Sequence, residues 1–284
     1  MADITAAVVN EFRKRTGLGL MECKAILKEA DGDLKRAEIL AKERGLKNVE
    51  KRSGRGTNAG RIEAAFNADR TAGALIELNC ETDFVARNDD FRAATKQLAE
   101  HILAVGDTGN APDTPLTGDP SKSIKDFLTD LGARTGENVT FSRAARFENA
   151  GRVEVYIHHD GKSGAMVAVN GSAPAETLST LAKDLALQVV AAKPLALGRD
   201  ELPTAAVEEQ KQIYIKQAED KPENIREKIA LGKLESWYAE NTLVDQLFVK
   251  DASKKVRDVI AAAGKDVTVV SFARFVVGEI AEGA

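Results

Sequence analysis

A short pattern occurs twice in this chain at a constant spacing, and this internal repeat constrains the fold more than any other feature. The segments Ala59–Glu63 and Gly73–Asn79 recur as Ala150–Glu154 and Gly164–Asn170, each 91 positions further on and without a gap. Internal repeats indicate that a structural unit has been copied along the chain. In each copy two short apolar segments flank a polar turn, which predicts a hairpin of two antiparallel strands. We therefore expect a duplicated core.

The two copies stop matching after the shared asparagine. Asp83 of the first copy falls opposite Pro174, and Phe84 falls opposite Ala175. An aromatic ring that the repeated core needed would be present in both copies. Burying a protruding aromatic ring in a partner's pocket contributes about 2–3 kcal/mol and often dominates the binding energy. The Asp83-Phe84 loop is therefore the leading candidate for a functional site, and the alternative is that Phe84 packs onto its own helix.

Composition narrows the class of protein. A chain of 284 residues has room for about two domains, and an apolar fraction of 43% suits an ordinary soluble core. The formal charge of −4 argues against a dedicated nucleic-acid-binding protein, which usually carries a strongly basic face. The N-terminus lacks the basic start of a signal peptide, and no apolar run approaches the length of a membrane span. We therefore expect a cytoplasmic protein with neither a membrane partner nor a direct role on nucleic acid.

Residues 1–46 predict a bundle of three short amphipathic helices. Asp3 is the expected N-cap of the first helix. The second helix is expected over Leu20–Glu29, and the third from Asp33 to near Gly45. The apolar side of the third helix is expected to carry Leu34, Ala37, Ile39, Leu40 and Ala41. So small a bundle is marginally stable by itself.

Two features surround this bundle. A glycine turn followed by Leu20-Met21 resembles the partner-binding loop of ubiquitin-associated (UBA) domains. The alternative is that both side chains cap the core of the bundle. Residues 47–60 are rich in Lys, Arg, Gly and Ser, a composition typical of a linker.

The rest of the chain predicts a core with an insertion. We expect an N-subdomain at 61–147, a C-subdomain built from 148–202 and 241–284, and a two-helix arm at 203–240. In the first half the expected elements are strands from Arg61 and up to Asn79, a helix capped by Asn88 with Phe91, Ala94, Leu98, Ile102 and Val105 on one side, a loop at 106–121, a helix near Ile124–Ala133 and a strand near Asn138–Phe147. In the second they are a hairpin turning at His159-Asp160-Gly161, a helix carrying Leu178 to Ala192, charged helices at Thr204–Glu219 and Glu223–Trp237, a helix at Ser253–Ala263 and a strand at Val267–Val277. The fold class is α+β: a three-helix UBA-like bundle, then a duplicated α/β core of antiparallel strands with packed helices, interrupted by a helical arm.

Groups suited to catalysis are few. Gly161-Lys162-Ser163 resembles the end of a phosphate-binding loop, but Tyr156 stands where that motif requires its first glycine. His158 and His159 are adjacent in a strand, where neighbouring side chains face opposite ways. Cys80 ends a strand that we expect to be buried, so it is interpreted as a packing thiol like Cys23. We expect no catalytic residue, no metal and no cofactor, and we favour a binding protein.

The loop region resembles a known family. Thr82–Asn88, which follows Glu77–Glu81, is similar to the signature of the translation elongation factor Ts family. Further segments similar to that family, in the same order, are Arg15–Lys24, Gly136–Val139, Ala192–Pro194 and Phe248–Asp251. The similarity covers almost the whole chain.

The resemblance implies a guanine nucleotide exchange factor for the GTPase elongation factor Tu. In the family, the loop that matches Thr82, Asp83, Phe84 and Val85 enters the GTPase, disturbs its Mg²⁺ and phosphate site and promotes GDP release. Further partner contacts are implied at Leu20, Met21, Arg87 and His158. The arm at 203–240 corresponds to the family's coiled-coil module, which makes dimer contacts in some members, so the arm is expected to pack either on a partner or on a second copy in a homodimer. Many relatives continue past Gly278 into another helix that contacts the GTPase, and we expect that contact to be missing here.

Two other functions remain open. A scaffold or adaptor protein would bind partners through the small bundle, dimerise through the arm and ignore nucleotide. A thiol or metal enzyme would use Cys80 and the histidine pair, and would lose its thiol chemistry in a Cys80→Ala variant.

Overall fold

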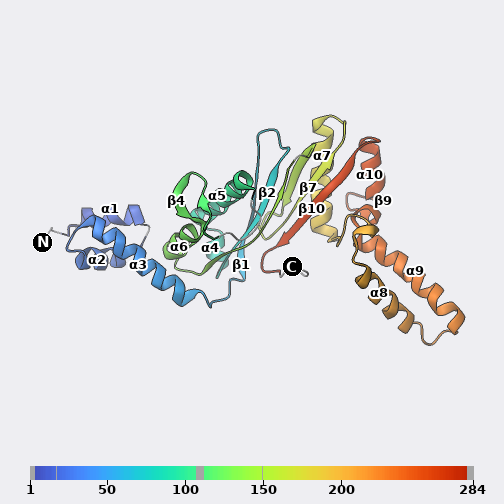
Figure 1. The fold of residues 1–284 in the computed structure, drawn as a ribbon, viewed down its shortest axis with the longest axis horizontal. Helices are drawn as coiled ribbons and strands as arrows, with labels where there is room; N and C mark the ends of the chain where they lie inside the picture. Colours follow the sequence, from blue (N-terminus) through green and yellow to red (C-terminus); the bar gives the residue numbers. More distant parts are fainter. Residues whose placement is uncertain (1–3, 17, 107–111, 149, 280–284) are drawn as a thin grey trace. The chain divides into compact units, whose positions relative to one another are not determined.

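The computed structural model describes residues 4–16, 18–106, 112–148 and 150–279 (Figure 1). The chain divides into two compact units. The first comprises Met1–Ala65, Ile76–Ala144 and Val277–Ala284, and the second comprises Phe66–Leu75 and Ala145–Val276. Both contain helices and antiparallel strands, which confirms the α+β class. Within the described ranges, no helix combines the length and the apolar character that crossing a bilayer requires.

Three helices open the first unit: α1 (Ala6–Thr16), α2 (Leu20–Glu29) and α3 (Leu34–Arg52). Their shared core includes the fully buried side chains of Phe12, Cys23, Ile26, Leu27 and Ala37. The expected cap Asp3 lies outside the described residues. At the start of α1 the Thr5 hydroxyl instead accepts a hydrogen bond from the Val8 amide at 3.4 Å.

The helix end predicted near Gly45 is wrong, because α3 continues to Arg52. A Cβ at Gly45 would lie 3.5 Å from the Ala133 Cβ, so Gly45 marks a close approach between helices rather than a stop. Residues 47–52, predicted as part of a linker, are therefore helical, while the domain boundary at 47–60 stays a prediction. The prediction that Ile39 lies on the buried side of this helix is also wrong, because its side chain is 61% exposed.

The first sheet has the strand order β1-β2-β5, formed by β1 (Ala59–Phe66), β2 (Gly73–Cys80) and β5 (Val139–Phe147). Every residue of β2 is buried. Gly60 is required by the pairing, since a Cβ there would lie 2.5 Å from the Leu78 carbonyl oxygen. The helices of this half are α4 (Asp83–Ala86), α5 (Asp89–Val105) and α6 (Ile124–Thr135). The Asn88 cap is confirmed, because its side chain accepts from the Asp90 amide at 2.8 Å.

The segment predicted as a loop over 106–121 contains part of a small hairpin, β3 (Pro115–Leu116) and β4 (Asp119–Ser123). Leu116 is buried and gives this hairpin its attachment to the core. Val105, expected on the buried side of α5, is 42% exposed because the helix ends there with Gly106 in the left-handed conformation.

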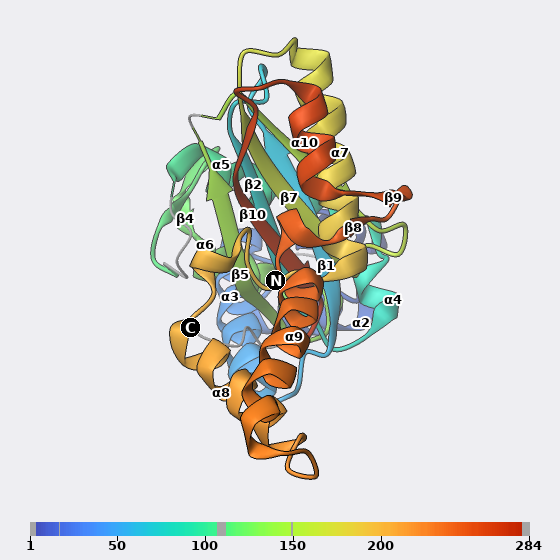
Figure 2. The ribbon, with the colours of Figure 1, turned by 90° about the vertical axis from the view of Figure 1, so that its right-hand side faces the viewer.

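The second unit repeats the same plan. Strands β6 (Arg152–Ile157), β7 (Ser163–Asn170) and β10 (Thr268–Val276) form an antiparallel sheet in the order β10-β7-β6. Helix α7 (Ala175–Ala192) packs on β6 and β7, and α10 (Val256–Ala263) lies beside α7 (Figure 2). Lys193 ends α7 in the left-handed conformation. The start predicted for α10 at Ser253 is wrong, because that residue belongs to strand β9 (Asp251–Lys255), which pairs with β8 (Leu247–Phe248).

The duplication extends further than the sequence pattern indicated. Strands β3 and β4 and the start of α6 recur as β8, β9 and the start of α10, each 132 positions later. Individual hydrogen bonds also correspond between the two copies. Asp119 accepts from the Ser121 hydroxyl at 2.6 Å, and Asp251 accepts from the Ser253 hydroxyl at 2.6 Å. The inserted arm lengthens the second copy, so a single offset could not reveal both parts of the repeat.

The arm is a helical hairpin of α8 (Thr204–Lys216) and α9 (Glu223–Asn241), which lie side by side (Figure 2). Short 3₁₀ turns precede and follow it at Arg199–Glu201 and Leu243–Asp245. No residue of α8 is buried, and in α9 only Ala230 and Leu234 are. The helices therefore share little apolar surface, and the predicted contact with a second copy stays a prediction.

Candidate functional site

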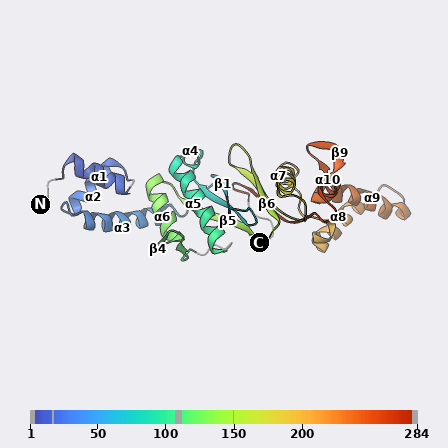
Figure 3. The same cartoon turned by 90° about the horizontal axis from the view of Figure 1, so that it is seen from above.

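The predicted loop between β2 and α5 contains a one-turn helix. Strand β2 ends at Cys80, and Thr82 has extended backbone angles that make it the N-cap of α4. Its hydroxyl accepts a hydrogen bond from the Val85 amide at 3.4 Å. Ala86 is buried and attaches the turn to the core. Helix α4 lies against the beginning of α5 (Figure 3).

Phe84 is the second residue of this turn and its side chain is 89% exposed, the largest value among the exposed large apolar side chains of the described residues. The alternative that Phe84 packs onto its own helix is therefore wrong. Asp83 and Val85, on either side, are half-buried. An exposed phenyl ring gains almost nothing from the protein's own core, so its full transfer free energy is available to a partner.

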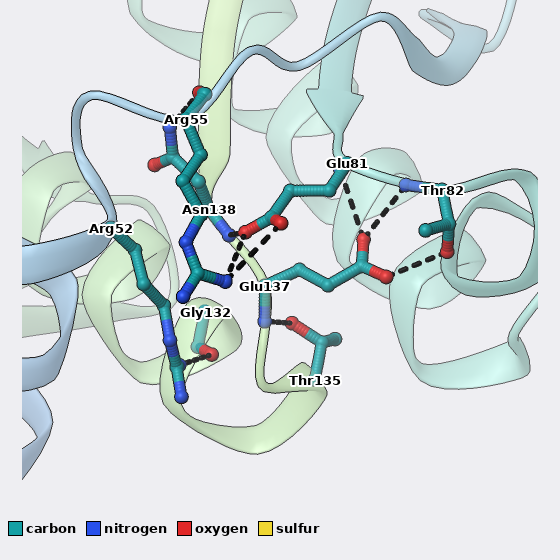
Figure 4. A network of polar contacts seen from close by, with 8 residues as sticks. All are labelled: Arg52, Arg55, Glu81, Thr82, Gly132, Thr135, Glu137 and Asn138. Carbon is teal, nitrogen blue, oxygen red and sulfur yellow. Dashed lines mark hydrogen bonds and ion pairs between the residues drawn. The ribbon is translucent and has the colours of Figure 1, made fainter.

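A single carboxylate holds the start of this turn (Figure 4). Glu137 Oε2 accepts hydrogen bonds from the backbone amides of Glu81 and Thr82, at 2.9 and 3.0 Å. Glu137 Oε1 accepts from the Thr82 hydroxyl at 2.6 Å. Hydrogen bonds to an ionised acceptor are stronger than those between neutral groups. The backbone of two consecutive residues is thus tied to one side chain from a distant part of the chain.

Glu81 makes the reciprocal contact (Figure 4). Its carboxylate accepts from the Asn138 amide at 2.7 Å and pairs with Arg55 at 3.4 Å. The Asn138 side chain in turn donates to the Arg55 carbonyl at 2.9 Å. The bond from the Asn138 amide, followed by the charge of Arg55, lowers the pKa of Glu81. Each carboxylate therefore accepts hydrogen bonds from the backbone of the other segment. The segment that follows β2 and the segment that precedes β5 are held together by both Glu81 and Glu137.

Cys80 is unsuited to nucleophilic chemistry. The thiol is buried, and burial, followed by the nearby Glu137 charge, raises its pKa to about 12. Its sulfur donates to the Thr82 carbonyl at 3.3 Å. At neutral pH such a thiol is almost entirely protonated, and the thiolate is the reactive form. These observations count against the thiol-enzyme alternative.

The histidine pair offers no metal site. The prediction that the two side chains face opposite ways from a strand is wrong, because β6 ends at Ile157 and the ring centroids of His158 and His159 lie 4.3 Å apart. His158 is half-buried beside Tyr156, whose hydroxyl lies 3.0 Å from His158 Nδ1, and His159 is exposed. Among the described residues, no group of three or more His, Cys, Asp and Glu side chains is placed to hold a metal ion. Gly161 lies in the hairpin turn with φ of 73°, not at the start of a helix, so the resemblance to a phosphate-binding loop has no structural support.

The predicted site residues fall into separate groups. One group lies in the continuous segment from Thr82 to Arg87 and consists of Thr82, Asp83, Phe84, Val85 and Arg87. Leu20 and Met21 are 48% and 77% exposed at the start of α2, so they do not cap the core of the bundle. His158 belongs to the second unit. The sequence pattern did not single out Glu137, although it lies in the Gly136–Val139 segment that resembled the family.

The fold and the site define a class of α+β protein that displays an exposed aromatic side chain on a turn whose backbone is held by a distant carboxylate. The profile of the family described as "Elongation factor TS" matches residues 81–279. Proteins named "Elongation factor Ts" from Trichlorobacter lovleyi, Aquifex aeolicus and Clostridium botulinum are 38%, 35% and 39% identical to this chain. These alignments cover 97%, 95% and 97% of the chain and 93%, 96% and 93% of the relatives.

The chain belongs to the elongation factor Ts family. Membership implies a nucleotide exchange factor of translation elongation, with elongation factor Tu as its partner.

Proposed function

We propose that this protein binds the GDP complex of elongation factor Tu and promotes GDP release by inserting the Asp83-Phe84 turn into the GTPase. The observation that carries the proposal is the 89% exposure of Phe84 on a turn whose backbone is held by Glu137. Insertion disturbs the Mg²⁺ and phosphate site of the GTPase. Mg²⁺ bridges nucleotide phosphates to protein oxygens, so moving its supports removes much of the hold on GDP.

Thermodynamic linkage sets the size of the effect. If the protein weakens GDP binding by some factor, GDP weakens the binding of the protein by the same factor. The transfer free energy of a phenyl ring, about 2–3 kcal/mol, corresponds to about a 30- to 150-fold change in an equilibrium. One ring is thus enough to supply a large part of the coupling.

Further contacts follow from the same proposal. Leu20 and Met21 supply exposed apolar surface on the bundle, and Arg87 and His158 supply polar contacts. The arm joins two copies of the chain through its exposed apolar side chains, Ile213, Ile225 and Leu231. The site of action is the cytoplasm, where elongation occurs.

The test measures release of a fluorescent GDP analogue from purified elongation factor Tu. Wild-type protein should accelerate release, and Phe84→Ala should slow the accelerated rate by about 30-fold or more. Leu195→Ala is the matched control, because Leu195 is a 65% exposed apolar side chain outside the proposed contacts. Wild-type rates from Phe84→Ala would refute the role of the ring. Binding that ignores nucleotide, without faster release, would favour an adaptor.

A further inference from the structure

We propose that Glu137 is a positioning residue for exchange: its carboxylate fixes the backbone at Glu81 and Thr82 so that Phe84 is presented outward in one orientation. This inference rests on the proposed function. Glu137 itself lies outside the turn that enters the partner in that proposal. It acts through the residues it holds.

The geometry shows why a carboxylate is suited to this role. The Glu81 amide, the Thr82 amide and the Thr82 hydroxyl converge on its two oxygens at 2.9, 3.0 and 2.6 Å. Gly136, with φ of 77°, ends α6 in the left-handed conformation immediately before Glu137. An exposed ring has no packing contacts of its own to fix its direction, so the order of the turn must come from its backbone.

The second copy of the repeat separates structural need from function. At the offset of 91, Ser172 corresponds to Glu81. Strands β5 and β10 are related by an offset of 129, which places Asp266 opposite Glu137. Asp266 Oδ2 accepts from the Ser172 amide at 2.7 Å. Both copies therefore tie the end of their second strand to a carboxylate that precedes their last strand.

The first copy adds contacts that the second lacks. Thr82 corresponds to Ala173, which has no hydroxyl, and the carboxylate of Glu81 is replaced by the hydroxyl of Ser172. In the second copy the Ser172 side chain also bonds to Asp266, so a hydroxyl contact to the carboxylate is present in both copies. The first copy adds the amide of Thr82 and places the hydroxyl contact one residue further along, at Thr82. This extension occurs in the copy that presents Phe84, whose counterpart is Ala175, so it accompanies the exposed ring rather than the shared fold.

The first measurement needs no partner. Hydrogen exchange of the backbone amides at 81–85 should accelerate about tenfold or more in Glu137→Ala, because the turn loses the acceptor for two amides. Glu137→Gln keeps one carbonyl oxygen as an acceptor and should restore part of the protection. Asp266→Asn is the matched control. It should accelerate exchange near Ser172 and leave 81–85 unchanged.

The second measurement is GDP release at increasing concentrations of each variant. Loss of positioning should lower the maximal release rate about tenfold, while the concentration for half-maximal release changes less than about threefold, since other surfaces still bind. Glu137→Gln should recover part of the maximal rate, and Asp266→Asn should match wild type. Thr82→Val keeps the shape of the side chain and removes the hydroxyl, with its 2.6 Å bond to Glu137 and its longer 3.4 Å cap bond to the Val85 amide. It should give a smaller loss than Glu137→Ala, and it serves if Glu137→Ala does not fold.

The outcomes separate the two proposals. Unchanged exchange at 81–85 in Glu137→Ala would overturn the positioning role, whatever the release rates are. Faster exchange with an unchanged maximal release rate would also overturn it, because the bonds would then be structural only. If wild-type protein fails to accelerate GDP release at any concentration, the proposed function itself falls and the positioning role with it.

Discussion

Phe84 and Phe91 are seven positions apart and should respond oppositely to truncation. The Phe84 ring is 89% exposed, whereas Phe91 in α5 is fully buried. Removing an exposed ring costs the fold little, and Phe84→Ala should leave the free energy of unfolding within about 0.5 kcal/mol of wild type. Removing the buried ring loses its transfer free energy and leaves a cavity, so Phe91→Ala should lower that free energy by about 3–5 kcal/mol.

Urea unfolding followed by far-ultraviolet circular dichroism measures both values, and the same samples then enter the GDP-release assay. Phe84→Ala should keep its stability and lose exchange activity. Phe91→Ala, in buffer without urea, should keep exchange activity in proportion to its folded fraction. The reasoning is refuted if Phe84→Ala lowers the free energy of unfolding by about 2 kcal/mol or more, since a ring that stabilises its own fold by that amount is not displayed for a partner.

Three further predictions concern the repeat, the carboxylates and the thiol. A Cβ at Gly60 would lie 2.5 Å from a backbone oxygen, whereas at Gly151 the corresponding distance is 3.2 Å. Gly60→Ala should therefore lower the free energy of unfolding, measured in urea, by about 2 kcal/mol more than Gly151→Ala does. Equal effects of the two substitutions would contradict this prediction. Hydrogen bonds from the Ser253 and Lys254 side chains lower the pKa of Asp251 from 3.8 to about 2. Because this pKa is lowered, the ionised Asp251 stabilises the fold fully above pH of about 4, and this stabilisation is lost as the pH falls towards 2. In Asp251→Asn the free energy of unfolding should therefore fall less steeply with pH between about 4 and 2. An unchanged acid transition would count against this role of Asp251. Cys80, with a pKa of about 12, should resist a thiol-specific reagent at pH 8 in a Cys23→Ala background until the protein is unfolded. Rapid labelling of the native protein would contradict the burial of this thiol.

Local sequence signals predicted the elements whose ends depend on nearby residues. Helix α2 has the predicted bounds, and Asn88 caps α5 as expected. Errors arose where a distant contact decided the outcome. The local sequence predicts that the helix ends near Gly45, but α3 packs close to Ala133 at this position and remains helical beyond it. Ile39 fits the apolar periodicity of its helix yet is exposed, since the bundle is too small to cover every apolar side chain.

The site shows the same division. A comparison of the two copies singled out Phe84 because the signal, an aromatic residue in one copy and alanine in the other, lies in the sequence itself. Glu137 was not found, because its partners Glu81 and Thr82 are more than fifty positions away and polar surface residues carry no periodic pattern. The signal that could have revealed it is the second offset of 129, which aligns Glu137 with Asp266.

The repeat explains how an unpacked ring can be held in place. A side chain inside a core is oriented by its neighbours, but a ring that must remain exposed until it meets a partner has only its backbone to orient it. The carboxylate bond that both copies share, at Glu137 and Asp266, already fixes the end of the second strand. Adding the amide and hydroxyl of Thr82 to the same acceptor extends this fixed region by one residue, up to the N-cap of the turn that bears Phe84. The two copies therefore share a fixed strand end, and in the first copy the bonds from Thr82 extend that fixed region to the turn that bears the exposed aromatic side chain.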